Sequence, residues 1–503
     1  MTLAELLADA LGTRLTASPP KIATGANAAT TAVAAAAASA VTGVSQDHRK
    51  VAPGHIFIAR VGAKFDGHRY ARLAIERGAI AVVGVLDAGP TLPWGATPYV
   101  RVSDDRVAVA RLAAAFHGHP SRSLTTVGIT GTDGKTTVST LLHHLLSAGV
   151  RCGLISTAGV RAHDVALPLE GHFTTPEASE VQGYLAAFRD ARCTHVVLES
   201  SSHALAMHRL DEVDYDVAVW TNLSAEHLDY HGSLEAYREA KLQLVRRAPV
   251  AVLNRDDPEF AVFSKATAGT VIDYGLHDSA SWRAEAVKES PAGLAFDVRA
   301  GAHRCRAFLP MLGTFNVHNA LAALAAASHL GVELELLVER LANFPGVPGR
   351  MQMIQSTPFA VVIDFAHTGP ALEKALAALR PAVRGRILLV VGAAGERDPG
   401  KRRPLGRAAA SGADLTFFTE EDYRSESLEA ILDELEAGAV EAGATSERMV
   451  RVTDRREAIA AAISRAREGD LVLLAGKGHE STLERGDESL PWDEAEEARR
   501  QLR

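Results

Sequence analysis

The sequence predicts an α/β protein of three domains with a mostly parallel central sheet. Three observations support this. The chain has 503 residues, apolar runs alternate with helical patterns, and two Pro/Gly-rich junctions interrupt the alternation. At roughly 100–200 residues per domain, this length accommodates three domains. The junctions at His119-Pro120 and at 344–350 predict domains over residues 1–119, 120–345 and 346–503.

The first domain is expected to be a small α/β unit. Its apolar runs and helical patterns predict strands over 55–59 and 79–83 and helices over 70–77 and 106–117.

The second and third domains show the alternation more clearly, which is typical of βαβ units. In the second domain we expect strands over 125–130, 195–199, 216–220 and 250–253, with helices between them, including 138–146 and 316–330. In the third we expect strands near 359–364, 386–392, 414–418 and 471–475, and helices near 370–380, 427–441 and 455–467.

Composition excludes several classes of protein. The net charge of −8 gives no reason to expect a nucleic-acid partner, so local basic groups must hold any anionic ligand. The three cysteines (Cys152, Cys193 and Cys305) are far apart and form no metal pattern, as expected of reduced thiols in the cytoplasm. The first 15 residues do not read as a signal peptide, and no apolar run reaches the ~18 residues of a membrane span.

A glycine-rich turn, Gly131–Thr137, lies between an apolar strand and a helix. Such a turn directs several backbone N–H groups and a helix N-terminus at one point, which favours phosphate binding. Lys135 would reach the terminal phosphates and the Thr136 hydroxyl would bind Mg²⁺. Because Ile129 stands where the strict P-loop has its first glycine, this is a shortened variant.

Polar residues follow the strands at the sheet edge where parallel sheets bind ligands. Glu199 is a hard oxygen ligand suited to Mg²⁺, or otherwise a solvated acid. Asn222 and His227 follow the next strand, and His227 is as consistent with packing as with a ligand role. Asp364 ends a strand of the third domain, and Arg350 in the junction before it is either a surface residue or one that reaches a phosphate on domain closure.

Two glycine-rich loops follow strands of the third domain. Residues 392–403 form a basic loop that alone would be a generic anion site, and residues 476–480 form a similar loop after the strand at 471–475.

Six motifs in order along the chain together resemble the Mur ligase family, and within it the MurE type: Thr130–Thr137, Glu199–Leu205, Thr221–Gly232, Gly313–Ala320, Val347–Met351 and Ala475–Glu480. The resemblance implies a UDP-binding domain, a central ATPase and a C-terminal Rossmann-like domain. It implies an ATP-dependent, amide-forming ligase of peptidoglycan synthesis that adds a diamino acid to UDP-MurNAc-L-Ala-D-Glu through an acyl phosphate. It also implies a cytoplasmic monomer.

The resemblance also implies roles for individual residues. Lys135, Glu199, His227 and Lys241 are the expected catalytic residues. Thr136, Glu199, His227 and a CO₂-derived carbamate on Lys241 are expected to bind Mg²⁺. The expected ATP contacts are Gly131, Thr132, Asp133, Gly134, Lys135, Thr136, Thr137, Asn316, Arg350 and Asp364. The expected UDP-muramyl-peptide contacts are Asp47, His48, Asp66, Thr174, Thr175, Ser201 and Arg209. The expected amino-acid contacts are Arg397, Glu421, Asp422, Tyr423, Arg424, Gly476 and Glu480.

Two positions depart from the family pattern. Asp47-His48-Arg49 replaces the usual Asp-Ser-Arg, and Met207 replaces a glutamine of some relatives, which leaves that substrate contact open.

The third amino acid of the product is the open question. Members that add meso-diaminopimelate typically carry Asp-Asn-Pro-Arg, whereas the chain has Glu421-Asp422-Tyr423-Arg424. An acid at Asp422 would repel the distal carboxylate of diaminopimelate and suit a lone ammonium, which favours L-lysine or L-ornithine. Arg424 and Arg397 keep diaminopimelate as an alternative.

Two other functions compete with this reading. A folylpolyglutamate-synthase-like ligase shares the central domain, but Asp66-Gly67-His68 and the 476–480 loop argue against it. A non-ligase, ATP-driven binding module would need neither an amino-acid site nor Arg209.

Overall fold

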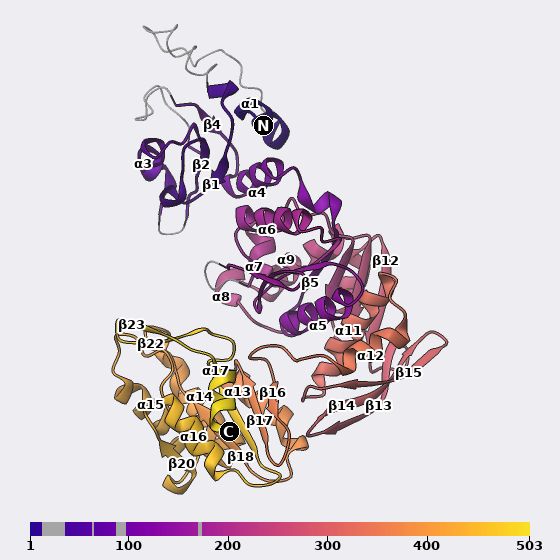
Figure 1. The fold of residues 1–503 in the computed structure, drawn as a ribbon, viewed down its shortest axis with the longest axis vertical. Helices are drawn as coiled ribbons and strands as arrows, with labels where there is room; N and C mark the ends of the chain where they lie inside the picture. The colour runs from indigo at the N-terminus through magenta and orange to yellow at the C-terminus, as the bar shows by residue number, and fades with distance from the viewer. Residues whose placement is uncertain (13–35, 63–64, 87–96, 170–173) are drawn as a thin grey trace. The chain divides into compact units, whose positions relative to one another are not determined.

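The computed structural model describes residues 1–12, 36–62, 65–86, 97–169 and 174–503. It has the α/β architecture that the sequence predicts (Figure 1). Two compact units are present. The first consists of Met1–Lys135, Leu146–Leu253 and Asp257–Ile272, and the second of Thr136–Leu145, Asn254–Asp256 and Asp273–Arg503.

The N-terminal part of the first unit contains a four-stranded parallel sheet in the order β1-β2-β3-β4. The strand predicted at 55–59 forms, and the one predicted at 79–83 forms two residues later, whereas β1 and β4 were not predicted. A Thr2 capping box starts the first helix, and its apolar face joins that of α4 in one core. The elements are α1 (Leu3–Leu11), β1 (Gly43–Ser45), η1 (His48–Lys50), β2 (His55–Ala59), η2 (Gly67–Tyr70), α3 (Ala71–Glu76), β3 (Ala81–Gly84), β4 (Tyr99–Arg101), α4 (Asp105–Phe116) and η3 (Pro120–Ser123).

The first unit also holds the strand order β11-β10-β5-β9-β6-β7-β8. The pairs from β11 to β6 are parallel, so the carboxyl ends of β5, β9 and β10 meet at one edge. All four strands predicted here are observed. The strands are β5 (Thr125–Thr130), β6 (Cys152–Ser156), β7 (Gly159–Ala162), β8 (Val165–Leu167), β9 (His195–Glu199), β10 (Val217–Trp220) and β11 (Val250–Asn254).

Helices connect these strands, as expected for βαβ units. The side chain of Ser233 caps α9, and a capping box at Glu177 starts α6. The helices are α5 (Lys135–Ser147), α6 (Ala178–Asp190), α7 (Ser202–Ala206), α8 (Leu228–His231), α9 (Leu234–Arg247) and α10 (Phe260–Ala266).

The second unit contains an antiparallel region that the sequence analysis did not predict. Strands β13 (Trp282–Ser290), β14 (Gly293–Ala300) and β15 (His303–Leu309) are antiparallel and lie in the order β13-β14-β15, whereas β12 (Thr270–Gly275) pairs with β13 in parallel. Four charged residues interrupt β13, so no continuous apolar run marks this strand. Helices α11 (Phe315–His329) and α12 (Leu334–Ala342) follow.

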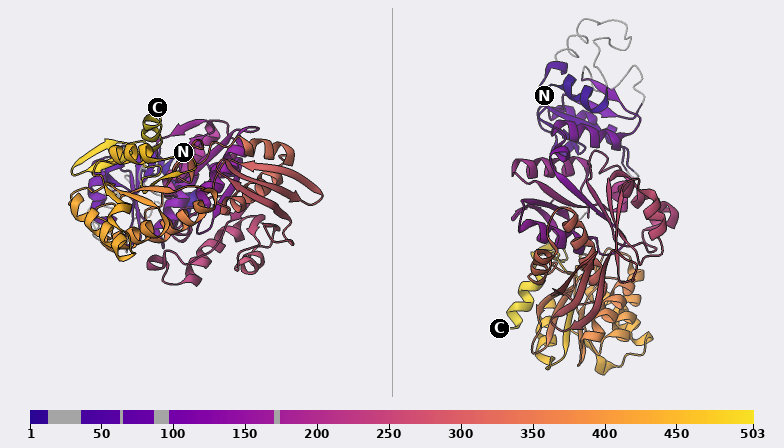
Figure 2. Two further views of the ribbon diagram at one scale, coloured as in Figure 1. Left: turned by 90° about the horizontal axis from the view of Figure 1, so that it is seen from below. Right: turned by 90° about the vertical axis from the view of Figure 1, so that its right-hand side faces the viewer.

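The C-terminal sheet has the order β16-β17-β21-β18-β19-β20 and is parallel except for β16. Its four predicted strands are all present. One face packs on α16 and α17, while α13, α14 and α15 form a separate layer (Figure 2). The elements are β16 (Gln352–Gln355), β17 (Ala360–Asp364), α13 (Gly369–Leu379), η4 (Arg380–Ala382), β18 (Ile387–Val391), η5 (Pro399–Lys401), α14 (Arg402–Gly412), β19 (Leu415–Phe418), α15 (Leu428–Glu441), η6 (Ser446–Arg448), β20 (Met449–Arg451), α16 (Arg455–Arg465), β21 (Leu471–Ala475) and α17 (Glu494–Gln501).

Two features of this region differ from the sequence analysis. The predicted basic loop at 392–403 ends in helix, and Arg402 is buried in ion pairs with Glu426 and Glu434 instead of facing a ligand. A hairpin of β22 (Thr482–Arg485) and β23 (Glu488–Pro491) follows the 476–480 loop. Within the described residues, no helix has both the length and the apolar character needed to cross a membrane.

Candidate active site

The glycine-rich turn after β5 has the backbone geometry that only glycine adopts easily. Gly131 has φ 150° and Gly134, at the N-cap of α5, has φ 86°. A Cβ on Gly131 would lie 1.8 Å from Thr221 Oγ1. The sequence of this turn is therefore dictated by both its conformation and its neighbour.

The segment after β10 braces the turn. The backbone N–H of Asp133 donates to Asn222 Oδ1 at 2.9 Å, and Thr221 Oγ1 donates to the Asp133 carbonyl at 2.6 Å. Asn222, placed by the sequence at this edge of the sheet, thus holds the turn in shape. The part of Thr221 was not predicted, because nothing in the sequence indicates that it contacts residues some 90 positions away.

Lys135 folds back over the turn that precedes it. Its ammonium donates to the carbonyls of Gly131 at 3.1 Å and Thr132 at 2.8 Å. Thr136 is the next residue of α5 and is partly exposed. A cation and the first N–H groups of a helix are thus close to one loop, as phosphate binding requires.

A second lysine reaches the same turn from α9. Lys241 is 1% exposed, and its ammonium donates to the Gly131 carbonyl at 2.6 Å. Tyr237 lies one helical turn earlier, with its ring centroid 4.2 Å from Lys241 Nζ and its hydroxyl 3.2 Å from Thr132 Oγ1. Burial, and secondarily the charge of Lys135, lower the pKa of Lys241 well below its usual value.

Glu199 ends β9 and is fully buried. Its two carboxylate oxygens accept hydrogen bonds from the backbone N–H of Thr157 at 3.1 Å and the Thr157 hydroxyl at 3.2 Å. His227 is about half exposed at the N-cap of α8, and its ring packs edge-on against His203 with centroids 4.8 Å apart. His203 and its burial were not predicted.

The chemistry of these groups fits Mg²⁺. A carboxylate, a hydroxyl and a carbamate are hard oxygen donors. Among the residues that the structure describes, no three His, Cys, Asp or Glu side chains form a metal site. Of the four expected Mg²⁺ ligands, only Glu199 and His227 belong to these residue types. Binding of Mg²⁺ would therefore also need the Thr136 hydroxyl and a carbamate on Lys241.

Four of the expected muramyl-peptide residues lie together near the end of β9. The Thr175 hydroxyl is within hydrogen-bond distance of the Glu199 carbonyl (2.8 Å) and of Ser201 Oγ (3.1 Å), and Ser201 caps α7. Arg209 donates to the Thr175 carbonyl at 2.9 Å. Thr174 adjoins Thr175 and is partly exposed.

Glu177 links Arg209 to a second arginine. Its carboxylate lies 2.6 Å from Arg209 Nη2 and 2.8 Å from Arg60 Nη1, and Arg60 also donates to Gln46 Oε1 at 2.9 Å. The sequence analysis missed Arg60, because its partner is 117 residues away.

Asp47 and Asp66, two of the expected UDP-muramyl-peptide contacts, cap short helices beside the N-terminal sheet. Asp47 caps η1, and the guanidinium of Arg49 lowers the pKa of Asp47 to about 2. The His48 ring stacks on Tyr70 with centroids 4.4 Å apart. Asp66 caps η2, and its Oδ1 lies 2.7 Å from the Nδ1 of His68.

The expected nucleotide contacts of the second unit are each locally fixed. Asn316 donates to the Leu312 carbonyl at 2.7 Å and accepts from Asn319 at 2.8 Å. The Arg350 guanidinium lies 4.8 Å from the Phe365 ring centroid.

Asp364 ends β17 and accepts hydrogen bonds from the backbone N–H groups of Met351 and Ala366, both at 2.9 Å. Burial raises the pKa of Asp364, although these bonds and Arg350 oppose the effect.

Asp422 does not present the free carboxylate that the sequence analysis expected. Its Oδ1 accepts from Lys477 Nζ at 2.8 Å and from the backbone N–H of Glu484 at 3.0 Å. Lys477 is fully buried and also pairs with Glu480 at 2.7 Å. The negative charge of Asp422 is therefore compensated within the protein.

Glu421, which precedes Asp422, has one carboxylate oxygen without a hydrogen-bond partner. It is 6% exposed, and its buried Oε2 has no hydrogen-bond partner. Burial raises its pKa to about 7. Gly476, at φ 104°, leaves space for it, since a Cβ there would lie 2.8 Å from that oxygen.

Arg424 is paired as well. Its Nε donates to Glu484 Oε2 at 2.7 Å and its Nη1 donates to the Gly395 carbonyl at 2.6 Å. Arg397 is exposed, and Tyr423 is partly exposed. Glu484 was not predicted as a site residue, and neither was the β22–β23 hairpin that carries it.

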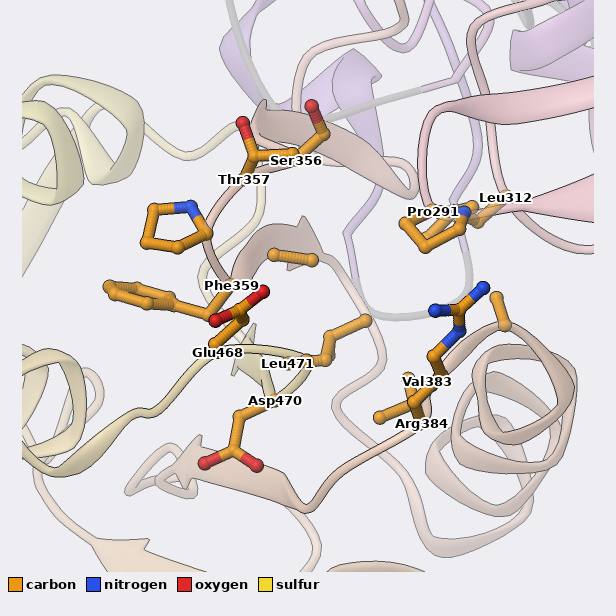
Figure 3. Close-up of a pocket in the computed structure, with 14 residues that line it drawn as sticks. Pro291, Leu312, Ser356, Thr357, Phe359, Val383, Arg384, Glu468, Asp470 and Leu471 are labelled. Atoms are coloured by element: carbon orange, nitrogen blue, oxygen red, sulfur yellow. The ribbon is translucent and has the colours of Figure 1, made fainter.

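A cavity of about 170 Å³ lies elsewhere in the second unit (Figure 3). Its lining includes Phe359 and Leu471, which lie at the amino ends of β17 and β21, and none of the expected site residues. Ligands of parallel sheets bind at the carboxyl ends, so this cavity does not indicate the active site.

Three protein-family models match the chain. A model described as the Mur ligase middle domain matches residues 129–327. Models described as the Mur ligase family catalytic domain and the Mur ligase glutamate ligase domain match residues 40–117 and 349–478. A UDP-N-acetylmuramyl-tripeptide synthetase of Deinococcus radiodurans is 50% identical over 91% of this chain and 94% of its own length. The chain belongs to the Mur ligase family.

Further relatives place it among the Mur ligases of MurE type. A UDP-N-acetylmuramoyl-L-alanyl-D-glutamate–2,6-diaminopimelate ligase of Geobacillus thermodenitrificans is 38% identical over 91% of this chain and 94% of its own length. A solved structure of a ligase with that same name has a TM-score of 0.68 and 31% identity, and covers 100% of this chain and 99% of its own.

A MurE-type Mur ligase is an ATP-dependent, peptidoglycan-forming enzyme, and the phosphate loop of the chain agrees with that activity. One relative is named only as a tripeptide synthetase, and the other is named for 2,6-diaminopimelate. The names of the relatives therefore leave the added amino acid open.

Proposed function

We propose that the chain adds a diamino acid, L-lysine or L-ornithine, to UDP-MurNAc-L-Ala-D-Glu in the cytoplasm. The D-Glu side-chain carboxylate would be phosphorylated by ATP, and the amine would attack the resulting acyl phosphate. Phosphorylation is needed because a carboxylate is a poor electrophile. The arrangement of Gly131, Lys135 and Lys241 at one turn supports the proposal most directly.

The phosphate loop would hold ATP. Lys135 would leave the loop carbonyls to which it is bonded and pair with the terminal phosphates, whose charge rises as the phosphoryl group is transferred. Gly131–Thr137 would contribute backbone N–H groups, and Asn316, Arg350 and Asp364 would contact the nucleotide. Mg²⁺, held by Thr136, Glu199, His227 and modified Lys241, would neutralise phosphate charge.

The environment of Lys241 supports its carbamylation. Only a neutral amine reacts with CO₂, and burial together with the charge of Lys135 lowers the pKa of Lys241, which favours the neutral form. The reaction adds CO₂ to the buried amine, releases one proton and gives an anion with two hard oxygen donors. That anion would suit both Lys135 and Mg²⁺ better than the free amine does.

The UDP-muramyl peptide would be bound by two groups of residues. Asp47, His48 and Asp66 would contact the uridine side, and Thr174, Thr175, Ser201 and Arg209 the peptide. Bonding among Thr175, Ser201 and Arg209 supports a common role, because these side chains are already positioned before substrate arrives.

The preference for a side-chain ammonium follows from charge. Glu421 offers a buried oxygen without a partner, while Arg424 and Lys477 each have a carboxylate partner. Asp422 and Glu480 would act by holding Lys477, and Arg397, Tyr423 and Gly476 would border the site. Meso-diaminopimelate is the alternative, and it would require Arg424 or Arg397 to bind a second carboxylate.

The test is ADP and phosphate release by the purified chain with ATP, Mg²⁺ and UDP-MurNAc-L-Ala-D-Glu. Parallel reactions contain L-lysine, L-ornithine or meso-diaminopimelate, and mass spectrometry identifies the nucleotide product. Turnover with L-lysine or L-ornithine supports the proposal. Turnover with diaminopimelate alone keeps the ligase but contradicts the charge argument, and hydrolysis that no amino acid affects favours the ATP-driven binding module.

The proposal also includes three domains, over residues 1–119, 120–345 and 346–503, and a monomeric state. Limited proteolysis tests the domain boundaries, and light scattering tests the monomeric state.

A further inference from the structure

The β22–β23 hairpin places a carboxylate on Arg424. Glu484 Oε2 accepts from Arg424 Nε at 2.7 Å. Arg424 Nη2 also lies 3.7 Å from Asp422 Oδ2. The guanidinium, which is about one-fifth exposed, therefore already has the anionic partner that a substrate carboxylate would supply.

The backbone fixes the position of Glu484. Its N–H donates to Asp422 Oδ1 at 3.0 Å, and its carbonyl accepts from the backbone N–H of Arg424 at 3.3 Å. The hairpin register pairs Glu484 with Ser489, and Arg485 next to it pairs with Glu420 and Asp454. The backbone of Glu484 is therefore held on both its N–H and its carbonyl, and the next residue along the strand is fixed by its own ion pairs.

The charges around this pair favour one class of substrate. The cations Arg424 and Lys477 face the acids Glu421, Asp422, Glu480 and Glu484. Arg455 also acts on Glu421, but its own charge is paired with Glu494. A distal carboxylate on the incoming amino acid would have to displace Glu484 and would meet this excess of acids. A distal ammonium would be attracted by the same charges.

We propose that Glu484 is a specificity-determining residue: by occupying Arg424, it restricts the third amino acid to diamino acids with a single carboxylate. The inference rests on the proposed ligase function. It differs from the expectation for Asp422, because here the carboxylate comes from an element 60 residues further along the chain. Glu484 acts through Arg424 and is not assigned a contact with the reacting atoms.

The test compares kcat/KM for meso-diaminopimelate with kcat/KM for L-ornithine. Glu484→Gln keeps the size of the side chain and removes its charge, and Glu484→Ala removes the carboxylate altogether. Both variants are expected to raise the diaminopimelate-to-ornithine ratio at least tenfold. The gain is expected to disappear in the double variant Glu484→Ala/Arg424→Ala, because the cation that would bind the second carboxylate is then missing.

Glu488→Gln is the matched control, since Glu488 is an exposed acid on the facing strand of the same hairpin. Retained turnover with ornithine shows that the Glu484 variants fold. An unchanged ratio in active Glu484 variants, or a preference of the unaltered protein for diaminopimelate, overturns the inference while leaving the ligase intact. Absence of turnover with every amino acid in the unaltered protein overturns the proposed function, and the inference with it.

Discussion

Lys241 on α9 and Gly131 in the phosphate loop are joined by a 2.6 Å hydrogen bond across 110 residues of sequence. The bond places a buried amine, rather than a surface lysine, beside the loop. Burial disfavours the charged form of Lys241 and lowers its pKa. The buried position of Lys241 therefore favours the neutral amine that carbamylation requires.

Lys241→Ala is expected to be inactive and to regain part of its activity when a small carboxylic acid such as formate is added, because the acid can replace the carbamate. Phosphate release with and without formate measures this. Lys265→Ala, at an exposed lysine on α10, should behave as the unaltered protein does. Full activity of Lys241→Ala without formate would remove carbamylation from the mechanism.

Lys135→Ala should reduce ADP release by a factor of at least about 10², since removing a single group that stabilises transition-state charge typically costs that much. The amino-acid-dependent rate measures the effect, and the melting temperature should stay close to that of the unaltered protein. Normal turnover in this variant would contradict the assignment of residues 131–137 as a phosphate-binding loop.

Gly131→Ala is expected to weaken ATP binding by about tenfold or more, because an alanine needs the strained φ of 150° and its Cβ would overlap Thr221 Oγ1. Nucleotide affinity can be followed by calorimetry. Gly183→Ala on α6 makes the same chemical change where the nearest side-chain atom is 3.7 Å away. Equal ATP affinity in both variants would show that the turn tolerates a side chain and is not shaped by Thr221.

Glu421 should make both stability and amino-acid binding depend on pH. Its folded-state pKa of about 7 lies above the usual 4.5, so its contribution to stability is present below about pH 4.5 and is lost as the pH rises through 7. A substrate ammonium pairs with the ionised form. We therefore expect the KM for L-ornithine to fall roughly tenfold between pH 6 and 8.

Steady-state kinetics over that range check this prediction. Arg455, Glu480, Lys477 and Asp422 also act on Glu421, so Glu421→Gln is compared with the unaltered protein at each pH. If the KM of the Glu421→Gln variant showed the same pH dependence, the titrating group would lie elsewhere.

Strand positions and the phosphate loop could be predicted because their signals are local. The strand at 471–475 is a continuous apolar run, and those at 125–130 and 195–199 have apolar centres that are buried on both faces. The turn at 131–137 needs glycine at fixed spacing. The strands at 282–309 were not predicted because charged residues interrupt their apolar positions. The predicted basic loop at 392–403 was too long, because α14 already begins at Arg402.

The sequence by itself determined the α/β class, the phosphate loop and the motifs of a Mur ligase, since each depends on residues close together in the chain. Only the tertiary structure decided which charges are already compensated. Lys477 neutralises Asp422 across 55 residues, and Glu484 neutralises Arg424 across 60. The strength of a charge pair depends on distance and burial, which spacing along the chain does not specify, so the charge available to a substrate becomes visible only once the loops and the hairpin have folded together.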